Sequence, residues 1–264
     1  MVRCNVLDHG YVDFVESWGS DERIIEAARM STDKGFQGWG GDNCKHCGAH
    51  RDSENLLTSN ACNKPPHAFS GTGDEKLLRY LWTHKHFTPF EMAGMSIEIQ
   101  APIFVVREWH RHRTQSYNEL SARYTELPDL YYLPSVERLM AGKQAKKNKQ
   151  SSEEGFSLAA VGLFRTAIER HVALSRRLYE DLLGDGMSRE LARIVIPLNQ
   201  YTRFRASANL RNWLQFLQLR LDSAAQWEIR QYAQAVAGLI QAQFPRTYAL
   251  FEEDNGAVST VPRP

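Results

Sequence analysis

Several features that mark other protein classes are missing from this 264-residue sequence. No run of residues approaches the roughly eighteen apolar residues that a membrane-spanning helix needs. The opening residues, MVRCNVLDHGYVDF, include acids and lack the apolar centre of a signal peptide. Internal repeats, a GxGxxG fingerprint and a P-loop are also absent. We therefore expect a cytoplasmic protein that does not use either of these nucleotide-binding loops.

The sequence also lacks an excess of charge of one sign. It contains 32 Lys and Arg against 31 Asp and Glu, for a formal net charge of +1. A dedicated nucleic-acid-binding domain is normally basic, so this balance argues against one. Hydrophobic residues make up 42% and aromatic residues 11%, enough for a sizeable core. We expect a single domain over residues 1–264.

Cysteine is scarce, and all four cysteines lie in the first quarter of the chain. Cys44 and Cys47 have the spacing of metal ligands, and Cys62 with His50 or His67 would complete a tetrahedral zinc site. Our candidate ligand set is Cys44, Cys47, Cys62 and His67. The surrounding segment is rich in Gly, Asn, Ser and Pro and has no periodicity, so a flexible loop with free thiols is the alternative.

Apolar periodicity predicts an α+β fold, rich in helices, with a small antiparallel sheet. We expect strands over residues 2–15 (a pair), 95–99 and 201–206, and helices from Ser20, from Asp74 as a cap, from Pro102, over 156–182, from Ser188, over 210–220 and over 224–244. Two segments interrupt this pattern: a loop insertion at about 36–72 and a polar connection at about 141–155. The long helix over 156–182 carries an apolar stripe that should face the core and that includes His171.

The most informative segment is RHRTQSYNELSARY, from Arg111 to Tyr124. It has almost no apolar residues, so it does not fit a core-packing role. Arginine forks bind phosphate oxygens bidentately, and the hydroxyl, amide and carboxylate groups between them suit a sugar or a base edge. A solvated, ion-paired surface is the alternative. Arg-His-Arg is too dense for simple i,i+4 pairing, which favours a site for a phosphorylated ligand.

Arg111-His112-Arg113, followed after seven residues by Ser121, resembles the signature of the flavin-dependent thymidylate synthases. The resemblance extends to AARMS ending at Ser31, HFTPFE from His86, APIFV, LARIVIPLNQYTRF and LRLDSAAQWEI. It covers nearly the whole chain except the insertion and the polar connection. It implies a homotetramer with a central sheet flanked by long helices and with FAD at the subunit junctions. The implied reaction methylates dUMP to dTMP, with methylenetetrahydrofolate as carbon donor and NADPH as the reductant of the flavin.

The resemblance also implies roles for individual residues. Those matching positions around the cofactor are Ser31, His86, Thr88, Arg111, His112, Arg113, Glu119, Asn209, Arg211 and Gln215. Those matching the dUMP site are Glu108, Ser121, Arg123, Arg193 and Arg220. Arg220 would polarise the pyrimidine and Ser121 is the second candidate catalytic residue. Glu108 stands where some relatives have glutamine, and its carboxylate could repel the phosphate.

The residues also bear on the mechanism. C5 of uracil is a weak nucleophile, and no cysteine lies near the candidate site to activate it. A serine hydroxyl needs an adjacent base to attack, and none is evident beside Ser121. We favour a binding role for Ser121 over a nucleophilic one, which leaves the difficult chemistry to the cofactor. A nucleic-acid-binding module and a flavoprotein oxidoreductase acting on another substrate are the rival functions.

Overall fold

The computed structural model describes residues 3–39, 73–144, 146, 152–153 and 155–256. The residues predicted to bind zinc lie outside these ranges, so that site stays a prediction. The strands are β1 (Arg3–Val6), β2 (Gly10–Trp18), β3 (Gly94–Pro102), β4 (Ser116–Glu119), β5 (Lys143–Gln144), β6 (Ser152–Glu153) and β7 (Tyr201–Asn209). The α-helices are α1 (Asp21–Arg29), α2 (Asp74–Thr83), α3 (Ile103–Trp109), α4 (Val136–Met140), α5 (Leu158–Gly184), α6 (Arg189–Ala192), α7 (Leu210–Arg220), α8 (Trp227–Gln243) and α9 (Pro245–Asn255). Short 3₁₀ helices are η1 (Met30–Thr32), η2 (Thr88–Met92) and η3 (Arg193–Val195).

A five-stranded antiparallel sheet organises the molecule, with strand order β1-β2-β3-β7-β4. In β3 the side chains of Met95, Ile97 and Ile99 are buried, while the residues between them are partly exposed. This alternation is what places one face of a sheet against a core and leaves the other polar. The predicted α+β class, the first strand pair, and the strands over 95–99 and 201–206 are confirmed.

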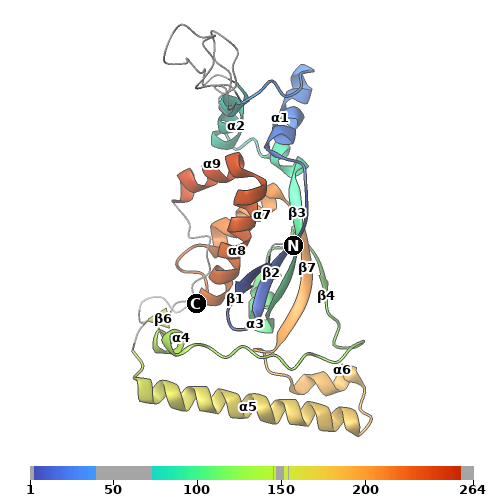
Figure 1. Ribbon diagram of the computed structural model, residues 1–264, viewed down its shortest axis with the longest axis vertical. Coiled ribbons are helices and arrows are strands. Elements are labelled where there is room, and N and C mark those ends of the chain that lie inside the picture. Colours follow the sequence, from blue (N-terminus) through green and yellow to red (C-terminus); the bar gives the residue numbers. More distant parts are fainter. Residues whose placement is uncertain (1–2, 40–72, 145, 147–151, 154, 257–264) are drawn as a thin grey trace, which may run out of the picture.

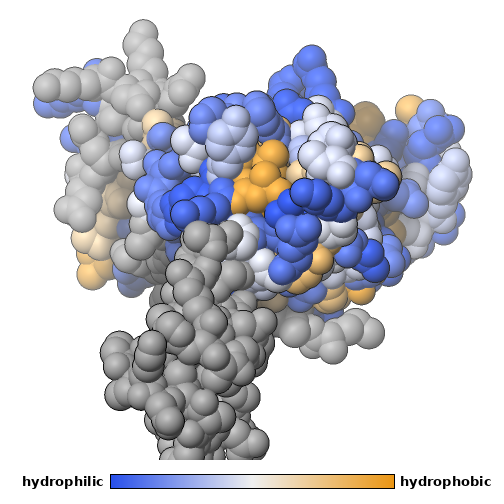
Figure 2. Space-filling model, turned by 90° about the horizontal axis from the view of Figure 1, so that it is seen from above, coloured by the Kyte–Doolittle hydropathy of each residue, from blue (hydrophilic) through white to orange (hydrophobic). Residues whose placement is uncertain are grey.

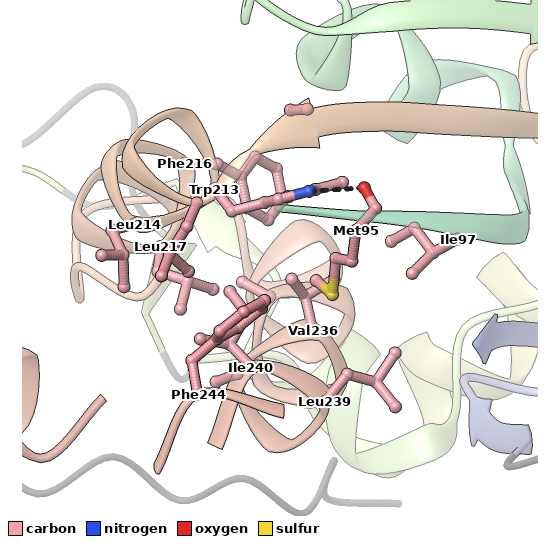
Figure 3. Packing of buried hydrophobic residues seen from close by; sticks show 14 of the residues in the cluster. Met95, Ile97, Trp213, Leu214, Phe216, Leu217, Val236, Leu239, Ile240 and Phe244 are labelled. Carbon is pink, nitrogen blue, oxygen red and sulfur yellow. Dashed lines mark hydrogen bonds between the residues drawn. The ribbon is translucent and has the colours of Figure 1, made fainter. Parts of the chain in front are cut away.

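The core lies between the sheet and helices α7 and α8, which stand beside it (Figure 1). Trp213 of α7 donates its indole N–H to the backbone oxygen of Met95, 3.0 Å away, and so ties the helix to β3. Figure 3 shows the apolar side chains that fill this space, namely Met95, Ile97, Trp213, Leu214, Phe216, Leu217, Val236, Leu239, Ile240 and Phe244. Each such burial contributes about 1.5–3 kcal/mol. The aromatic residues Trp213 and Phe216 of α7 are therefore part of the core.

Helix α5 is as long as predicted, but its apolar stripe does not face the core of this chain. Leu163 is 74% exposed and Leu174 is 67% exposed, and His171 is exposed as well, so the prediction of a core histidine is wrong. The helix crosses one end of the molecule (Figure 1), and its buried residues are Val161, Ser175 and Tyr179. Periodicity shows that a helix has an apolar face, not which surface covers it.

Asp74 is the second correction. The N-cap of α2 is Gly73, and Asp74 is the first residue of the helix itself. Its fully buried carboxylate accepts hydrogen bonds from Arg29 Nε at 2.7 Å and from the backbone N of Gln37 at 2.6 Å. The carboxylate thus binds Arg29 and Gln37, which are distant in the sequence, and a local capping pattern does not predict such partners. Ser20, in contrast, caps α1 as predicted, since its hydroxyl accepts from the backbone N of Arg23 at 3.3 Å.

The two ends of the molecule differ in surface character. The end that carries α1 and α2 is mostly hydrophilic around a small apolar area (Figure 2), whereas α5 exposes leucines at the other end. No helix in the described ranges is long and apolar enough to cross a membrane.

Candidate active site

The first residues of the arginine-rich segment form a fixed turn between α3 and β4. Trp109 ends α3 fully buried and donates its indole N–H to Gln115 Oε1 at 3.1 Å. Tyr117 of β4 reaches back and donates its hydroxyl to the backbone oxygen of His112 at 2.8 Å. These bonds hold the turn so that Arg111 and Arg113 are exposed while the ring of His112 is buried. The signature therefore presents its two arginines outward and its histidine inward.

Glu108, His112 and Arg220 meet in one cluster, although they come from α3, the turn and the end of α7. Arg220 donates Nε–H to His112 Nε2 at 2.8 Å, forms an ion pair with the Glu108 carboxylate, and donates Nη2–H to the Glu108 backbone oxygen at 3.3 Å. Its side chain is only 16% exposed. A carboxylate beside this guanidinium compensates a charge that would otherwise be costly to bury.

The imidazole of His112 is neutral in this cluster. Burial, reinforced by the positive charge of Arg220, lowers the pKa of His112 to about 4. Because Nε2 accepts the hydrogen bond from Arg220, the single proton of the neutral ring must be on Nδ1. The ring also packs edge-on against Phe216, with centroids 4.9 Å apart. His112 is thus an acceptor and not a cation.

A cavity of about 690 Å³ lies beside this cluster, and Glu108, Arg111 and Arg220 line it together with residues of the segment that follows α7. Arg111 and Arg113 make no side-chain hydrogen bond or ion pair with any other described residue, so both guanidinium groups are available to an anion. Glu108 does not add an uncompensated negative charge here, since its carboxylate is paired with Arg220. The expected repulsion of a phosphate by Glu108 is therefore largely removed.

A second cavity, of about 380 Å³, has Glu119, Ser121 and Arg193 in its lining. Ser121 Oγ accepts from the backbone N of Arg123 at 3.3 Å, and within the described ranges no carboxylate or imidazole is hydrogen-bonded to it. Glu119 accepts a hydrogen bond from Thr202 Oγ1 at 2.7 Å. Arg193, at the start of η3, lines the same cavity as Ser121. Among the described residues, the serine thus has no base in place to make it a nucleophile.

Arg123 lies close to this cavity without being part of its lining. Its exposed guanidinium is 3.3 Å from the carboxylate of Glu190. Glu190 also accepts, through its backbone oxygen, from Arg193 Nε at 3.3 Å. The two arginines predicted for a phosphate therefore share one neighbour, and only weak, exposed contacts must be released for them to bind an anion.

Two of the remaining cofactor candidates, Arg211 and Gln215, line a third cavity, of about 460 Å³. Arg211 is ion-paired with Glu91 of η2 and lies over the ring of Phe87 at 5.7 Å. His86 lies edge-on to Tyr80, with ring centroids 5.7 Å apart. Asn209 is the N-cap of α7, with its side chain accepting from Asn212 N at 3.0 Å.

Two further candidates lie in short 3₁₀ helices. Thr88 is the first residue of η2, and Ser31 in η1 donates its hydroxyl to the backbone oxygen of Ala28 at 3.1 Å. The predicted residues that line a cavity are thus divided among three cavities of one chain, and the structure does not bring them into a single one. It also adds Gln218, Asp222 and Gln226, which line the cavity beside Arg220. Gln218 lies three residues after Gln215 and so on the same face of the helix. This spacing is the sequence signal that could have identified Gln218.

The comparisons with known proteins agree on one family. The family model described as thymidylate synthase complementing protein matches residues 13–246. The flavin-dependent thymidylate synthase of Thermus thermophilus is 38% identical over 249 residues, which cover 94% of this chain and 77% of that protein. The corresponding protein of Thermosipho africanus is 36% identical over 246 residues, which cover 93% of this chain and 92% of that protein.

A solved structure also matches over almost the full chain. The UMP/dUMP methylase PolB from Streptomyces cacaoi, bound with 5-Br UMP, has a TM-score of 0.74 at 27% identity and covers 98% of this chain and 99% of that one. This chain therefore belongs to the flavin-dependent thymidylate synthase family, as its signature predicted, and it is an enzyme of the methyltransferase type.

Proposed function

We propose that this member of the flavin-dependent thymidylate synthase family converts dUMP to dTMP by reductive methylation. Methylenetetrahydrofolate would supply the carbon and NADPH the two reducing electrons, by way of FAD. The observation that carries the proposal is the arrangement around Arg220, which is held by Glu108 and His112 beside a cavity that Arg111 also lines. We treat residues 1–264 as one catalytic domain with the insertion at about 36–72.

The residues fit an FAD group. Arg111 and Arg113 are exposed and unpaired among the described residues, as the binding of a pyrophosphate by guanidinium forks requires. Arg211 and Gln215, beside the third cavity, offer further polar groups to the cofactor. When bound and reduced, the flavin supplies a hydride. The protein positions it and excludes water, while the redox chemistry belongs to the cofactor.

Ser121, Arg123 and Arg193 are our candidates for binding dUMP. The two guanidinium groups would take its phosphate, and their present partners are exposed or are backbone groups. Arg220 would contact the pyrimidine. Because this cation is partly buried, it can stabilise negative charge on a pyrimidine carbonyl more strongly than an exposed arginine could.

The proposed mechanism uses no enzyme cysteine. Cys4, the one cysteine in the described ranges, lies on β1, at the opposite edge of the sheet from β4 and the arginine-rich segment. Ser121 has no base bonded to its hydroxyl within those ranges. We therefore assign Ser121 to binding, and we assign to Arg220 the polarisation that makes the pyrimidine reactive.

We further propose a homotetramer with active sites between subunits. A face of α5 exposes Leu163, Leu174 and Leu178, and contiguous apolar surface of this kind is typical of a subunit interface. The three cavities of one chain each hold only part of the candidate site. Residues from a second copy would bring the flavin and nucleotide candidates together.

Tritium release from [5-³H]dUMP tests the proposed reaction. Release should require both NADPH and methylenetetrahydrofolate, and dTMP should form in equal amount. UMP is the matched comparison, since PolB is a UMP/dUMP methylase. Absence of flavin absorbance after reconstitution with FAD would reject the proposal in favour of a binding module. Flavin reduction by NADPH without tritium release would favour an oxidoreductase of another substrate.

A further inference from the structure

His112 differs from the two arginines of its signature in the direction that it faces. Arg111 and Arg113 are exposed, whereas His112 is 9% exposed and its ring packs against Phe216. Its Nε2 atom accepts the Nε–H of Arg220 at 2.8 Å. The resemblance assigns all three residues to the flavin cofactor, but this contact gives the histidine another partner.

The chemistry of the ring suits that partner and not a phosphate. A neutral imidazole with Nε2 engaged as an acceptor has no positive charge to offer an anion. Nδ1–H is its one remaining donor. Holding the side chain of Arg220 is therefore a function that the buried ring can perform without touching a cofactor.

The contacts also limit what Arg220 can do. A guanidinium group has five N–H donors in a rigid plane, and three of them are engaged, one by His112 and two by Glu108. The acceptor on Nε prevents the plane from turning about the Cδ–Nε bond. Two N–H donors are left, both on the terminal nitrogens, and Arg220 lines the cavity beside the cluster.

We propose that His112 is a positioning residue for Arg220 and is not a ligand of the flavin cofactor. Its neutral ring, together with Glu108, fixes the guanidinium so that the two remaining N–H donors meet the pyrimidine. This inference rests on the proposed role of Arg220 at the nucleotide. It predicts that a change at His112 acts through Arg220 and leaves flavin binding intact.

The test compares three substitutions of His112. The amide of His112→Gln can place an acceptor about where Nε2 lies, whereas His112→Asn carries the same group too far back to reach Arg220. His112→Leu removes the acceptor at similar volume. Each protein is examined for fold by circular dichroism, for FAD stoichiometry by absorbance, and for kcat and the KM for dUMP. Glu26→Gln, in an exposed ion pair with Arg23, is the control.

We expect His112→Asn and His112→Leu to lower kcat at least tenfold with FAD stoichiometry unchanged. His112→Gln should recover activity to within about threefold of the unsubstituted protein. In an Arg220→Ala background the same changes should alter kcat less than twofold, because the group that they position is gone. Should His112→Leu not fold, the Asn and Gln pair gives the same comparison.

Two results would overturn the inference. One is loss of FAD in parallel with activity, which would make His112 a cofactor ligand. The other is a loss of kcat that is as large in the Arg220→Ala background as in the unsubstituted protein when His112 is changed. Both are distinct from failure of the proposed function, in which the unsubstituted protein would form no dTMP and release no tritium from dUMP.

Discussion

Acidification will destabilise this protein through His112. In the folded chain, burial and the neighbouring Arg220 cation lower the pKa of His112 to about 4, from the ordinary value of 6.5. Between these values the unfolded chain binds a proton that the folded chain does not. The stability associated with the neutral ring is therefore fully present above about pH 6.5 and is lost as the pH falls toward 4.

The size of the effect follows from the gap between the two pKa values. A gap of about 2.5 units corresponds to at most about 3–4 kcal/mol, since each unit is worth about 1.36 kcal/mol. The cluster borders a cavity open to solvent, which screens the charge of a protonated ring. We therefore expect a loss of about 1–2 kcal/mol in the free energy of unfolding between pH 7 and pH 4.5.

Urea unfolding followed by tryptophan fluorescence measures this loss at a series of pH values. The quantity of interest is the difference between the unsubstituted protein and His112→Gln, which cannot titrate at this position. Asp21, whose pKa burial raises, contributes equally to both proteins and cancels. Protein concentration is held constant because assembly makes the apparent stability depend on it. A difference that varies by less than about 0.5 kcal/mol over this pH range would refute the reasoning, and exposed His171→Gln is the control.

Three further changes test other parts of the structure. Ser121→Ala should keep tritium release within roughly tenfold, because it removes a single hydrogen-bonding group; complete loss with FAD and dUMP still bound would indicate a nucleophile. Leu174→Glu should dissociate the proposed tetramer in light scattering, and an unchanged mass would exclude this face of α5 from the interface. Asp74→Ala should lower the free energy of unfolding by about 3–5 kcal/mol, because it leaves the Arg29 charge unpaired; a loss below 1 kcal/mol in thermal unfolding would contradict that account.

Local patterns were enough to predict most elements that pack on the sheet. Met95, Ile97 and Ile99 alternate along β3, and Trp213, Phe216 and Leu217 form an apolar stripe on α7. Such patterns predict an element correctly when its apolar face packs against the core. In this chain those faces do meet it. The small antiparallel sheet and the helices that cover it follow from the same periodicities.

Strand β4 and helix α9 are among the elements that escaped prediction, and each did so for a physical reason. Strand β4 lies within the arginine-rich segment, and its polar sequence shows no alternation of apolar residues. It is a strand because it pairs with β7. Helix α9 begins at Pro245 directly after α8, where the backbone of Phe244 (φ −134°, ψ 61°) leaves the helical conformation and separates the two. Both elements depend on contacts or backbone angles that a single window of sequence does not contain.

The candidate site was harder to predict from local sequence than the fold, because ion pairs between distant residues alter the charge that a ligand meets. Taken alone, Glu108 is a carboxylate at a position expected to face a phosphate. In the fold it neutralises Arg220, from which it is separated by 112 positions in the sequence. Arg111 is then the cation of this cavity that has no ion-pair partner among the described residues, while Asp222 is a further charged residue in the lining. An anionic cofactor would be drawn to that arginine, while the paired Arg220 would meet a neutral base at lower electrostatic cost. The pairing of the arginines thus supports the proposed division of the signature between a flavin and a nucleotide.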